Sequence, residues 1–377
     1  MIYLDNAATS FPKPSCMTDA MITCLSEYCG NPGRSGHNMS IKTAEKIFDT
    51  RQTLADFFHA ENPLQFVFCS NTTEALSLAI KGTLQAGDHV ITTCMEHNSV
   101  LRPLFSNEEI ETTIVWSDDC GRISPDQIRV EIKDNTKMII CTHSSNVTGT
   151  ILPIKEIGQL AYEHNLLFLV DAAQSAGALP IDLKELPVDM MAFAGHKSLL
   201  GPQGTGFLYV REGLDLIPLK DGGTGTESKN TKQPHSFPEG YEAGTVNSPG
   251  IVGLGESVKY VQSIGVNAIR QWEEYITDIL YSELRNMKHI TLYGPENAEE
   301  KTAIITLNVK GMECEEVAFI LNKDHQIAAR SGFHCAPYAH KVIGTYSTGA
   351  VRLSPGAFTT QDEISKTIDA FNRIGNK

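Results

Sequence analysis

The chain has 377 residues, 41% of them hydrophobic and 20% charged, and its 31 basic and 45 acidic side chains leave a net charge of −14. This composition excludes a disordered, collagen-like or coiled-coil chain, and the length predicts one large and one smaller domain. An acidic surface repels nucleic acid and anionic lipid, so we expect neither as a partner. The chain has no apolar run long enough for a membrane helix and no leader-like first segment, so we expect a cytoplasmic protein.

Nine cysteines are scattered along the chain without any Cys-x-x-Cys pair. An odd number in a long chain argues against a disulfide framework, and the lack of ligand spacing argues against a structural zinc site. We therefore expect no bound metal, and we expect most of the thiols to be small buried hydrophobic groups.

The middle of the chain alternates short apolar runs with amphipathic segments. Strands are predicted at residues 65–68, 89–93, 137–141, 166–171, 190–194 and 206–210, and helices at 73–84 and 154–164. Continuous apolar runs such as 137–141 are typical of strands buried on both faces of a parallel sheet. The alternation predicts an α/β fold with a mainly parallel sheet.

Residues 221–250 are rich in turn-forming residues and poor in apolar ones. We interpret them as a long ordered loop, and loops of this length in a folded domain are usually functional. The elements expected after it are helices over 251–286, strands at 289–292 and 302–308, and an amphipathic helix over 360–374.

A lysine and an aspartate each follow an apolar strand. Lys197 lies in a glycine-rich turn after the strand 190–194, where desolvation lets a lysine form a Schiff base. Asp171 ends the strand 166–171, at the sheet edge where α/β proteins present ligand groups. Pyridoxal phosphate requires this pair of groups. Taken singly, a solvated loop lysine and a helix N-cap remain alternatives.

Polar side chains also follow three other strands. Residues 70–74 open a helix, where free N–H groups and hydroxyls bind a phosphate or merely form a capping box. His97 could stack on a pyridine ring or be an ordinary polar residue. Asn146 could bind the phenolic oxygen of the cofactor or serve as a turn residue. Several such groups at successive strand ends are less readily a coincidence than any one alone.

The C-terminal third contains a candidate nucleophile and a candidate carboxylate ligand. Cys335 follows His334 in a loop with glycine and proline, and a nearby imidazole favours the reactive thiolate; an inert thiol is the alternative. Arg352 lies in an apolar run, where its guanidinium could bind a substrate carboxylate or form an internal salt bridge.

Together these segments resemble the class V aminotransferase family of pyridoxal-phosphate enzymes, in particular its cysteine desulfurase and selenocysteine lyase group. The resemblance rests on the motifs at 146–149, 171–175, 195–197 and 330–336, which occur in family order. The last motif has the form found with a short, structured Cys loop. The chain departs from the family pattern at Asn71, usually glycine, at Ala194, usually serine, and at Phe333, often histidine.

The resemblance implies the PLP-dependent transferase fold of the aspartate aminotransferase type. In that fold a large cofactor-binding domain holds a seven-stranded, mainly parallel sheet, and a smaller α/β domain packs beside it. Carried onto this chain, residues 14–255 form the large domain, and residues 1–13 and 256–377 form the small one. Active sites of this fold lie at a dimer interface, so a homodimer is implied.

The resemblance also implies which residues bind the cofactor, pyridoxal 5'-phosphate. Lys197 matches the Schiff-base lysine, Asp171 the partner of the pyridinium nitrogen, Gln174 the residue near the phenolic oxygen, and His97 the stacking histidine. The phosphate ligands implied are Thr72, Thr73 and His196, with Thr224 reaching the phosphate of the partner subunit.

For the substrate, the resemblance implies Asn146 and Arg352 as carboxylate ligands and Cys335 as the sulfur acceptor. Lys197, Cys335 and His97 are then the catalytic residues. The expected reaction converts L-cysteine to L-alanine and leaves the sulfur as a persulfide on Cys335, from which an acceptor protein could collect it. The alternatives are a selenocysteine lyase or another β-eliminating PLP lyase, and a catalytically idle scaffold in iron–sulfur assembly.

Overall fold

A computed structural model describes residues 1–33 and 35–375. Its main sheet has seven strands in the order β2-β8-β7-β6-β5-β3-β4. The strands are β2 Phe66–Cys69, β3 His89–Thr93, β4 Glu111–Val115, β5 Thr136–Thr142, β6 Leu167–Asp171, β7 Met190–Ala194 and β8 Gly206–Val210. Only β8 runs against the others, because its pairs with β2 and β7 are antiparallel while the remaining pairs are parallel. The predicted seven-stranded, mainly parallel sheet is confirmed.

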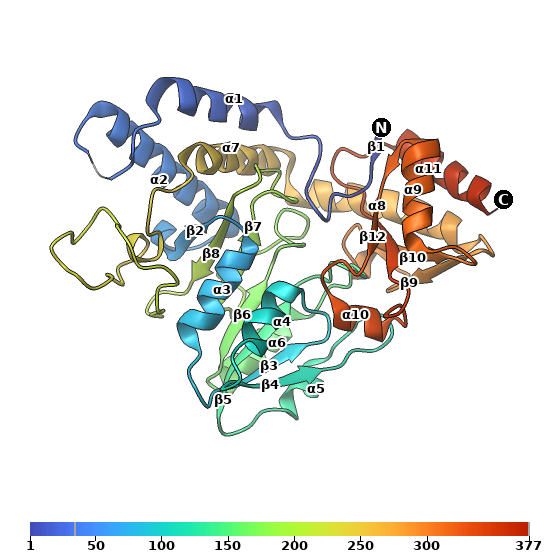
Figure 1. Cartoon of the computed structure of the whole chain (residues 1–377), viewed down its shortest axis with the longest axis horizontal. Helices are drawn as coiled ribbons and strands as arrows, with labels where there is room; N and C mark the ends of the chain where they lie inside the picture. Colours follow the sequence, from blue (N-terminus) through green and yellow to red (C-terminus); the bar gives the residue numbers. More distant parts are fainter. Residues whose placement is uncertain (34, 376–377) are drawn as a thin grey trace.

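Helices cover both faces of this sheet (Figure 1). Successive strand residues point to opposite faces, so Ile91 and Ile139 pack with one group of helices, and Val90 and Met138 with the other. The first group is α2 Asn38–Phe58, α6 Ile154–Glu163 and α7 Ser248–Ile264, with α1 Ser15–Thr23 outside it; the second is α3 Thr72–Thr83 and α4 Asn98–Phe105. Apolar side chains on both faces explain why the strands read as continuous apolar runs.

The C-terminal third forms a second, antiparallel sheet in the order β12-β13-β10-β9. Its strands are β9 Ile290–Tyr293, β10 Ile305–Val309, β12 Arg330–Gly332 and β13 Ala350–Leu353, and its helices are α8 Val266–Arg285, α9 Cys314–His325, α10 Pro337–Val342 and α11 Gln361–Ile374. The N-terminal strand β1 Ile2–Tyr3 pairs with β11 Ile327–Ala328, and Leu4 lies in the core of this part. The two ends of the chain therefore belong to one packed unit (Figure 1).

The remaining elements are short: α5 Pro125–Arg129, the π-helix η1 Cys24–Tyr28, and the 3-10 helices η2 Pro63–Gln65, η3 Glu239–Tyr241 and η4 Ala298–Glu300. Apart from η3 and the start of α7, the predicted loop 221–250 is irregular, as expected. The helices predicted over 251–286 are present, and they are divided at Gly265, whose φ of 88° ends α7 before α8 begins. Among the described residues, we find no helix that combines the length and the apolar character needed to cross a bilayer.

Candidate active site

A cavity of about 200 Å³ lies at the carboxyl edge of the parallel strands. The predicted site residues that line it are Thr72, Thr73, His97, Asn146, Asp171, Gln174, His196, Lys197 and Arg352. They converge because parallel strands end at the same edge of a sheet. Cys335 and Thr224 are the two predicted residues that do not line this cavity.

Lys197 and Asp171 are the two charged groups that the main sheet brings into the cavity. Gly195, just before the lysine, leaves no room for a side chain, because a Cβ there would lie 2.3 Å from Oγ1 of Thr205. Burial lowers the pKa of Lys197 to about 8, although Asp171 acts in the opposite direction. Near neutral pH, part of the lysine population is therefore uncharged and can act as a nucleophile or a base.

Asp171 is 5% exposed, and its Oδ1 accepts a hydrogen bond from the backbone N–H of Ala173 at 2.9 Å. Burial raises its pKa, while this hydrogen bond and the charge of Lys197 lower it. No helix begins directly after Asp171 in the described chain, so this contact belongs to a turn and the alternative of a helix N-cap is wrong; the residue lines the cavity. Beside it, Gln174 donates its amide N–H to the carbonyl of Ala7 at 3.0 Å, which ties the N-terminal segment over the cavity.

His97 is held as a neutral ring at the start of α4. Its Nδ1 accepts the backbone N–H of Ser99 at 3.1 Å, so the side chain is the N-cap of this helix. Burial, and then the charges of Lys197 and Arg330, lower its pKa to about 4. The Ser99 hydroxyl also lies 2.7 Å from Oγ1 of Thr73, which links the ring to α3. Sequence analysis did not single out Ser99, because its importance depends on this contact between helices.

The N-terminus of α3 forms one wall of the cavity. Asn71 caps the helix, with Oδ1 accepting the N–H of Glu74 at 2.9 Å, so the asparagine that departs from the family pattern has a structural role. The first N–H groups of a helix have no acceptor within it and attract anions. In the same cavity, Nδ1 of His196 is buried and lacks a hydrogen-bond partner among the described residues. This wall fits a phosphate group.

Cys335 is exposed on a tight turn beside the cavity. The N–H of Ala336 donates to the carbonyl of Phe333 at 3.0 Å, and the two residues between them have positive φ values, 49° for His334 and 58° for Cys335. Such backbone costs non-glycine residues about 1 to 3 kcal/mol each and is kept only where surrounding contacts enforce it. Here Asn146 donates its amide N–H to the carbonyl of His334 at 2.6 Å.

The expected effect of His334 on the thiol of Cys335 cannot come from a positive charge on the ring. His334 is 3% exposed, and burial and then the charge of Arg352 lower its pKa to about 2, so the ring is neutral. The turn nevertheless presents the thiol at the surface. The backbone N–H of Asn98 donates to the carbonyl of Cys335 at 2.7 Å, so this contact holds the backbone and does not involve the side chain.

Arg352 forms the internal salt bridge that the sequence left open as one alternative, and it also lines the cavity. Its side chain is 1% exposed, and one terminal nitrogen lies 3.1 Å from Oδ1 of Asp5. The other terminal nitrogen donates to the carbonyl of Asn146 at 2.8 Å, and Nε has no partner among the described residues. Arg330 pairs with it across β12 and β13 and lines the same cavity. Sequence analysis missed Arg330 as a site residue, since its position follows from strand register. Two neighbouring guanidinium groups suit a carboxylate ligand.

Comparison with known proteins identifies the family. The family model for class V aminotransferases matches residues 2–367. The chain belongs to this family. One relative is a probable cysteine desulfurase of Methanothermobacter thermautotrophicus, which is 35% identical over 96% of this chain and 92% of the relative. Another is a probable cysteine desulfurase of Pyrococcus abyssi, which is 34% identical over 99% of this chain and 94% of the relative. The solved apo structure of a cysteine desulfurase from Thermococcus onnurineus superimposes with a TM-score of 0.93 at 32% identity, covering 100% of this chain and 94% of that one.

Class V aminotransferases are PLP-dependent, and the residues of the cavity fit that cofactor. The cofactor needs a buried carboxylate, which Asp171 provides, and a lysine of lowered pKa, which Lys197 provides. It also needs a phosphate site, which the α3 N-terminus can form with Nδ1 of His196, an atom without a partner among the described residues. Thr224 lies in the loop between β8 and α7, where its hydroxyl donates to the carbonyl of Thr226 at 3.1 Å. The roles of the individual residues stay predictions.

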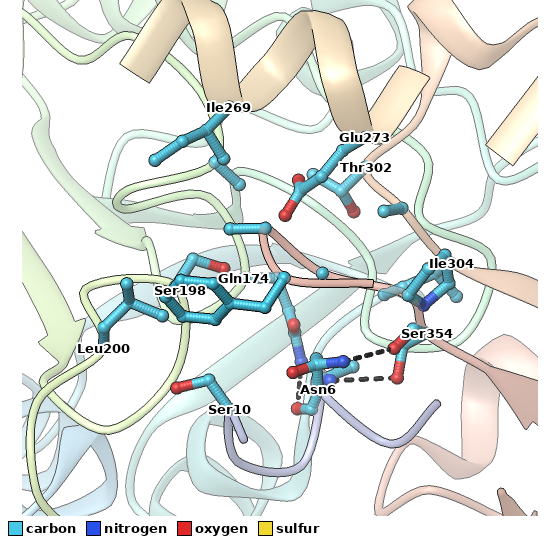
Figure 2. Close-up of a pocket in the computed structure, with 17 residues that line it drawn as sticks. Asn6, Ser10, Gln174, Ser198, Leu200, Ile269, Glu273, Thr302, Ile304 and Ser354 are labelled. Carbon is cyan, nitrogen blue, oxygen red and sulfur yellow. Dashed lines mark hydrogen bonds between the residues drawn. The ribbon is translucent and has the colours of Figure 1, made fainter. Parts of the chain in front are cut away.

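A second, smaller cavity of about 30 Å³ lies directly behind the first, with Ala7 and Gln174 on the shared wall. It has room for one or two water molecules. Figure 2 shows Glu273 of α8 and Thr302 on one side of this cavity, across from Gln174 and Ser198. Glu273 is 4% exposed, and burial raises its pKa to about 8.

The buried acid predicts a pH dependence of stability. The folded protein keeps a proton on Glu273 that the unfolded chain loses above the ordinary pKa of 4.5, so the contribution of this residue to stability falls as the pH rises from about 4.5 to about 8. Glu273→Gln removes the titrating group. The measured quantity is the melting temperature of the variant minus that of the unmodified protein. We expect this difference to be several degrees larger at pH 8 than at pH 5.

The control is Glu274→Gln, one residue away on α8. Glu274 is an acid already paired with Arg270, whose Nε lies 2.6 Å from its carboxylate. This variant should show no such gain at pH 8. A constant difference between Glu273→Gln and the unmodified protein across this pH range would contradict the prediction.

Proposed function

We propose that this protein is a PLP-dependent cysteine desulfurase that converts L-cysteine to L-alanine and carries the sulfur as a persulfide on Cys335. The observation that carries the proposal is the combination of a Lys197–Asp171 pair in one cavity with an exposed cysteine on a strained turn beside it. Relatives that are 34–35% identical over nearly the whole chain bear the name of this activity. The presence of the lysine, the aspartate and the cysteine together argues against an idle scaffold.

In this proposal Lys197 would bond the cofactor, Asp171 would pair with its pyridinium nitrogen, and His97 would pack against its ring. Gln174 would bind near its phenolic oxygen. Thr72, Thr73 and His196 would hold its phosphate. When bound, the cofactor would supply an electron sink that stabilises negative charge at the Cα of the substrate.

The side chains of the protein then carry out the remaining steps. Arg352, with a free N–H at Nε and a second guanidinium from Arg330 beside it, holds the substrate carboxylate, and Asn146 contributes its remaining amide N–H. Lys197 would move the proton of the substrate Cα at its Nζ, which its lowered pKa allows.

Cys335 accepts the sulfur of the substrate held in this way. Its thiolate attacks the substrate sulfur, so that a sulfur–sulfur bond forms and the Cβ–sulfur bond breaks. The electron pair of the broken bond stays on the carbon fragment, and a proton added there completes alanine. An acceptor thiol, on a small molecule or a partner protein, must later collect the sulfur from Cys335.

The proposed function is tested by a product assay. Cofactor-loaded protein is incubated in parallel with L-cysteine, L-selenocysteine and cysteine sulfinate, and alanine, pyruvate and protein-bound sulfur are measured. We expect alanine from cysteine together with a persulfide on the protein. Pyruvate with free sulfide would indicate a β-eliminating lyase, and alanine from selenocysteine alone would indicate a selenocysteine lyase; either result would overturn the proposal.

We further propose a homodimer in which Thr224 completes the phosphate site of the partner subunit. Thr224 does not line the cavity of its own chain, and it borders the same groove as Phe48 of α2. Large apolar side chains are exposed on this side of the molecule, as a covered surface would require: Ile22, Leu25, Met39, Ile41 and Phe48.

Mixed dimers test this arrangement. Thr224→Ala and Lys197→Ala homodimers should both be impaired. When the two are unfolded together and refolded, one site of each mixed dimer regains an intact Lys197 and an intact Thr224 from its partner. We expect activity to return on mixing. A mixture no more active than the Thr224→Ala protein alone would contradict a contribution across the interface, and a fully active monomer in sedimentation would contradict the dimer.

Two further proposals concern the setting of the site. We propose the domain division given by the resemblance, residues 14–255 against 1–13 and 256–377. Residues 34 and 376–377 of these ranges lie outside the described residues. The separate cores that contain Phe193 and Leu4 support the division. The limit at 255 falls within α7. We also propose a cytoplasmic location, which suits nine cysteines that are all unpaired.

A further inference from the structure

Three residues behind the Cys335 turn form a buried hydrogen-bonded chain. Nδ1 of His334 lies 3.2 Å from Nε2 of His340, and Nδ1 of His340 lies 2.7 Å from Oγ1 of Thr345. The two rings are stacked, with centroids 5.4 Å apart and planes 21° from parallel. All three side chains are at most 3% exposed. The reaction proposed above uses none of them.

The outer end of this chain has an unused nitrogen. His334 lines the active-site cavity, and its Nε2 is buried without a hydrogen-bond partner among the described residues. A buried polar atom left unpaired costs about 1 to 3 kcal/mol, so such an atom in an open cavity points to a ligand that pairs with it.

The chain permits two arrangements of its protons. In one, the Thr345 hydroxyl donates to His340, His340 donates from Nε2 to His334, and His334 carries its proton on Nε2, facing the cavity. In the other, both rings carry the proton on Nδ1, and His334 presents a lone pair instead. Both arrangements keep the two hydrogen bonds between these side chains, and a ligand in the cavity that accepts a hydrogen bond favours the first of them.

The charges around His334 indicate which ligand this is. Arg352 and Arg330 line the same cavity, and Nε of Arg352 is a second buried donor without a partner among the described residues. Two guanidinium groups attract an anion, and an anion needs donors rather than lone pairs around it. The proposed substrate carries one anionic group of this kind, its α-carboxylate.

We propose that His334, fixed as the Nε2–H tautomer by His340 and Thr345, donates a hydrogen bond to the substrate α-carboxylate beside Arg352. His334 is then a substrate-binding residue, and His340 and Thr345 are positioning residues that act through it. The proposal rests on the proposed function only in taking a free amino acid as the substrate. The residue before the sulfur-accepting cysteine thus recognises the substrate and does not activate the thiol.

The first test observes the tautomer directly. Nitrogen NMR of cofactor-loaded protein with ¹⁵N-labelled histidine distinguishes a protonated ring nitrogen from an unprotonated one, and the His334→Asn and His340→Gln variants assign the two rings. With bound L-alanine, we expect a proton on Nε2 and none on Nδ1 in both rings. Protons on Nδ1 in both rings would overturn the proposal. The tautomers are observed in the unmodified protein, and the variants serve only to assign its two ring signals.

The second test separates carboxylate recognition from other effects. The affinities of L-alanine and of ethylamine, which lacks the carboxylate, are measured from the change in cofactor absorbance. His334→Asn, which can replace Nδ1 but not Nε2, should weaken L-alanine about tenfold and leave ethylamine unchanged, because one hydrogen bond to a charged group is lost. His334→Gln, whose amide reaches the Nε2 position, should restore part of the affinity.

Thr345→Val removes the hydroxyl that starts the chain and should weaken L-alanine in the same direction. The matched control is Thr348→Val, since the hydroxyl of Thr348 bonds the carbonyl of Gly349 and lies outside the chain. Equal loss for both ligands, or no loss in His334→Asn, would overturn the proposal. If these results hold but cysteine yields no alanine, the proposed function fails and the carboxylate site stands. If cysteine yields alanine but the loss of affinity is absent, the carboxylate site fails and the proposed function stands.

Discussion

Replacing Lys197 by alanine is expected to abolish turnover of cysteine and covalent binding of the cofactor while leaving the protein folded. The lysine supplies both the nitrogen that bonds the cofactor and the base that moves the substrate proton, and its lowered pKa suits both tasks. We expect a rate at least about a thousandfold lower, since the loss of a general base alone costs up to about 10⁴. Borohydride reduction followed by peptide mass spectrometry measures the bond, because reduction fixes the cofactor on the lysine that holds it.

The matched control is Lys13→Ala. Lys13 lies near the same turn, where its Nζ donates to the carbonyl of His196 at 2.8 Å, and it does not line the cavity. After reduction of the Lys13→Ala protein, the cofactor should still be found on Lys197. Cofactor fixed on another lysine of the unmodified protein, or normal turnover by the Lys197→Ala protein, would refute the assignment.

Replacing Cys335 by alanine is expected to abolish alanine formation from cysteine and to spare part of the activity on selenocysteine. Sulfur transfer from cysteine needs an acceptor thiol, whereas selenium leaves more readily. The contact described for Cys335 uses its backbone carbonyl, which accepts the N–H of Asn98, so the variant should keep the turn. We expect at least about a thousandfold loss with cysteine, the scale seen when an attacking nucleophile is removed.

Mass spectrometry of unmodified protein after incubation with cysteine locates the sulfur. Cys29 provides an internal control, because it is the other exposed cysteine among the described residues. The added sulfur should be on Cys335 and absent from Cys29. Sulfur on both would show that exposure alone explains the labelling, and undiminished cysteine turnover by the Cys335→Ala protein would favour the lyase.

The strands and the main site residues were predictable because they depend on local pattern and on one rule of topology. Buried parallel strands such as β5 and β6 are continuous apolar runs, and their carboxyl ends meet at one edge. Asp171, Lys197 and His97 therefore lie together even though they are far apart in the chain. Strand β4 was not predicted, because it is an edge strand whose residues are mostly part-exposed and partly polar.

Residues whose role depends on a neighbour from a distant segment were not predictable. Arg330 becomes a site residue because antiparallel register places it opposite Arg352. Glu273 becomes a buried acid because α8 packs it against a cavity lined by the N-terminal segment and the loops after β6 and β7. No local pattern records strand register or packing between segments.

The sequence by itself determined the family, the α/β architecture and the identity of most groups in the cavity, since these follow from motifs and from periodicity along the chain. The tertiary structure alone decided the protonation and the partners of those groups. In the sequence His334 is an imidazole beside a cysteine and suggests a group that favours the thiolate; in the fold it is a neutral ring stacked on His340 near Arg352. Desolvation and neighbouring charges set that state, and both arise only when distant segments pack together.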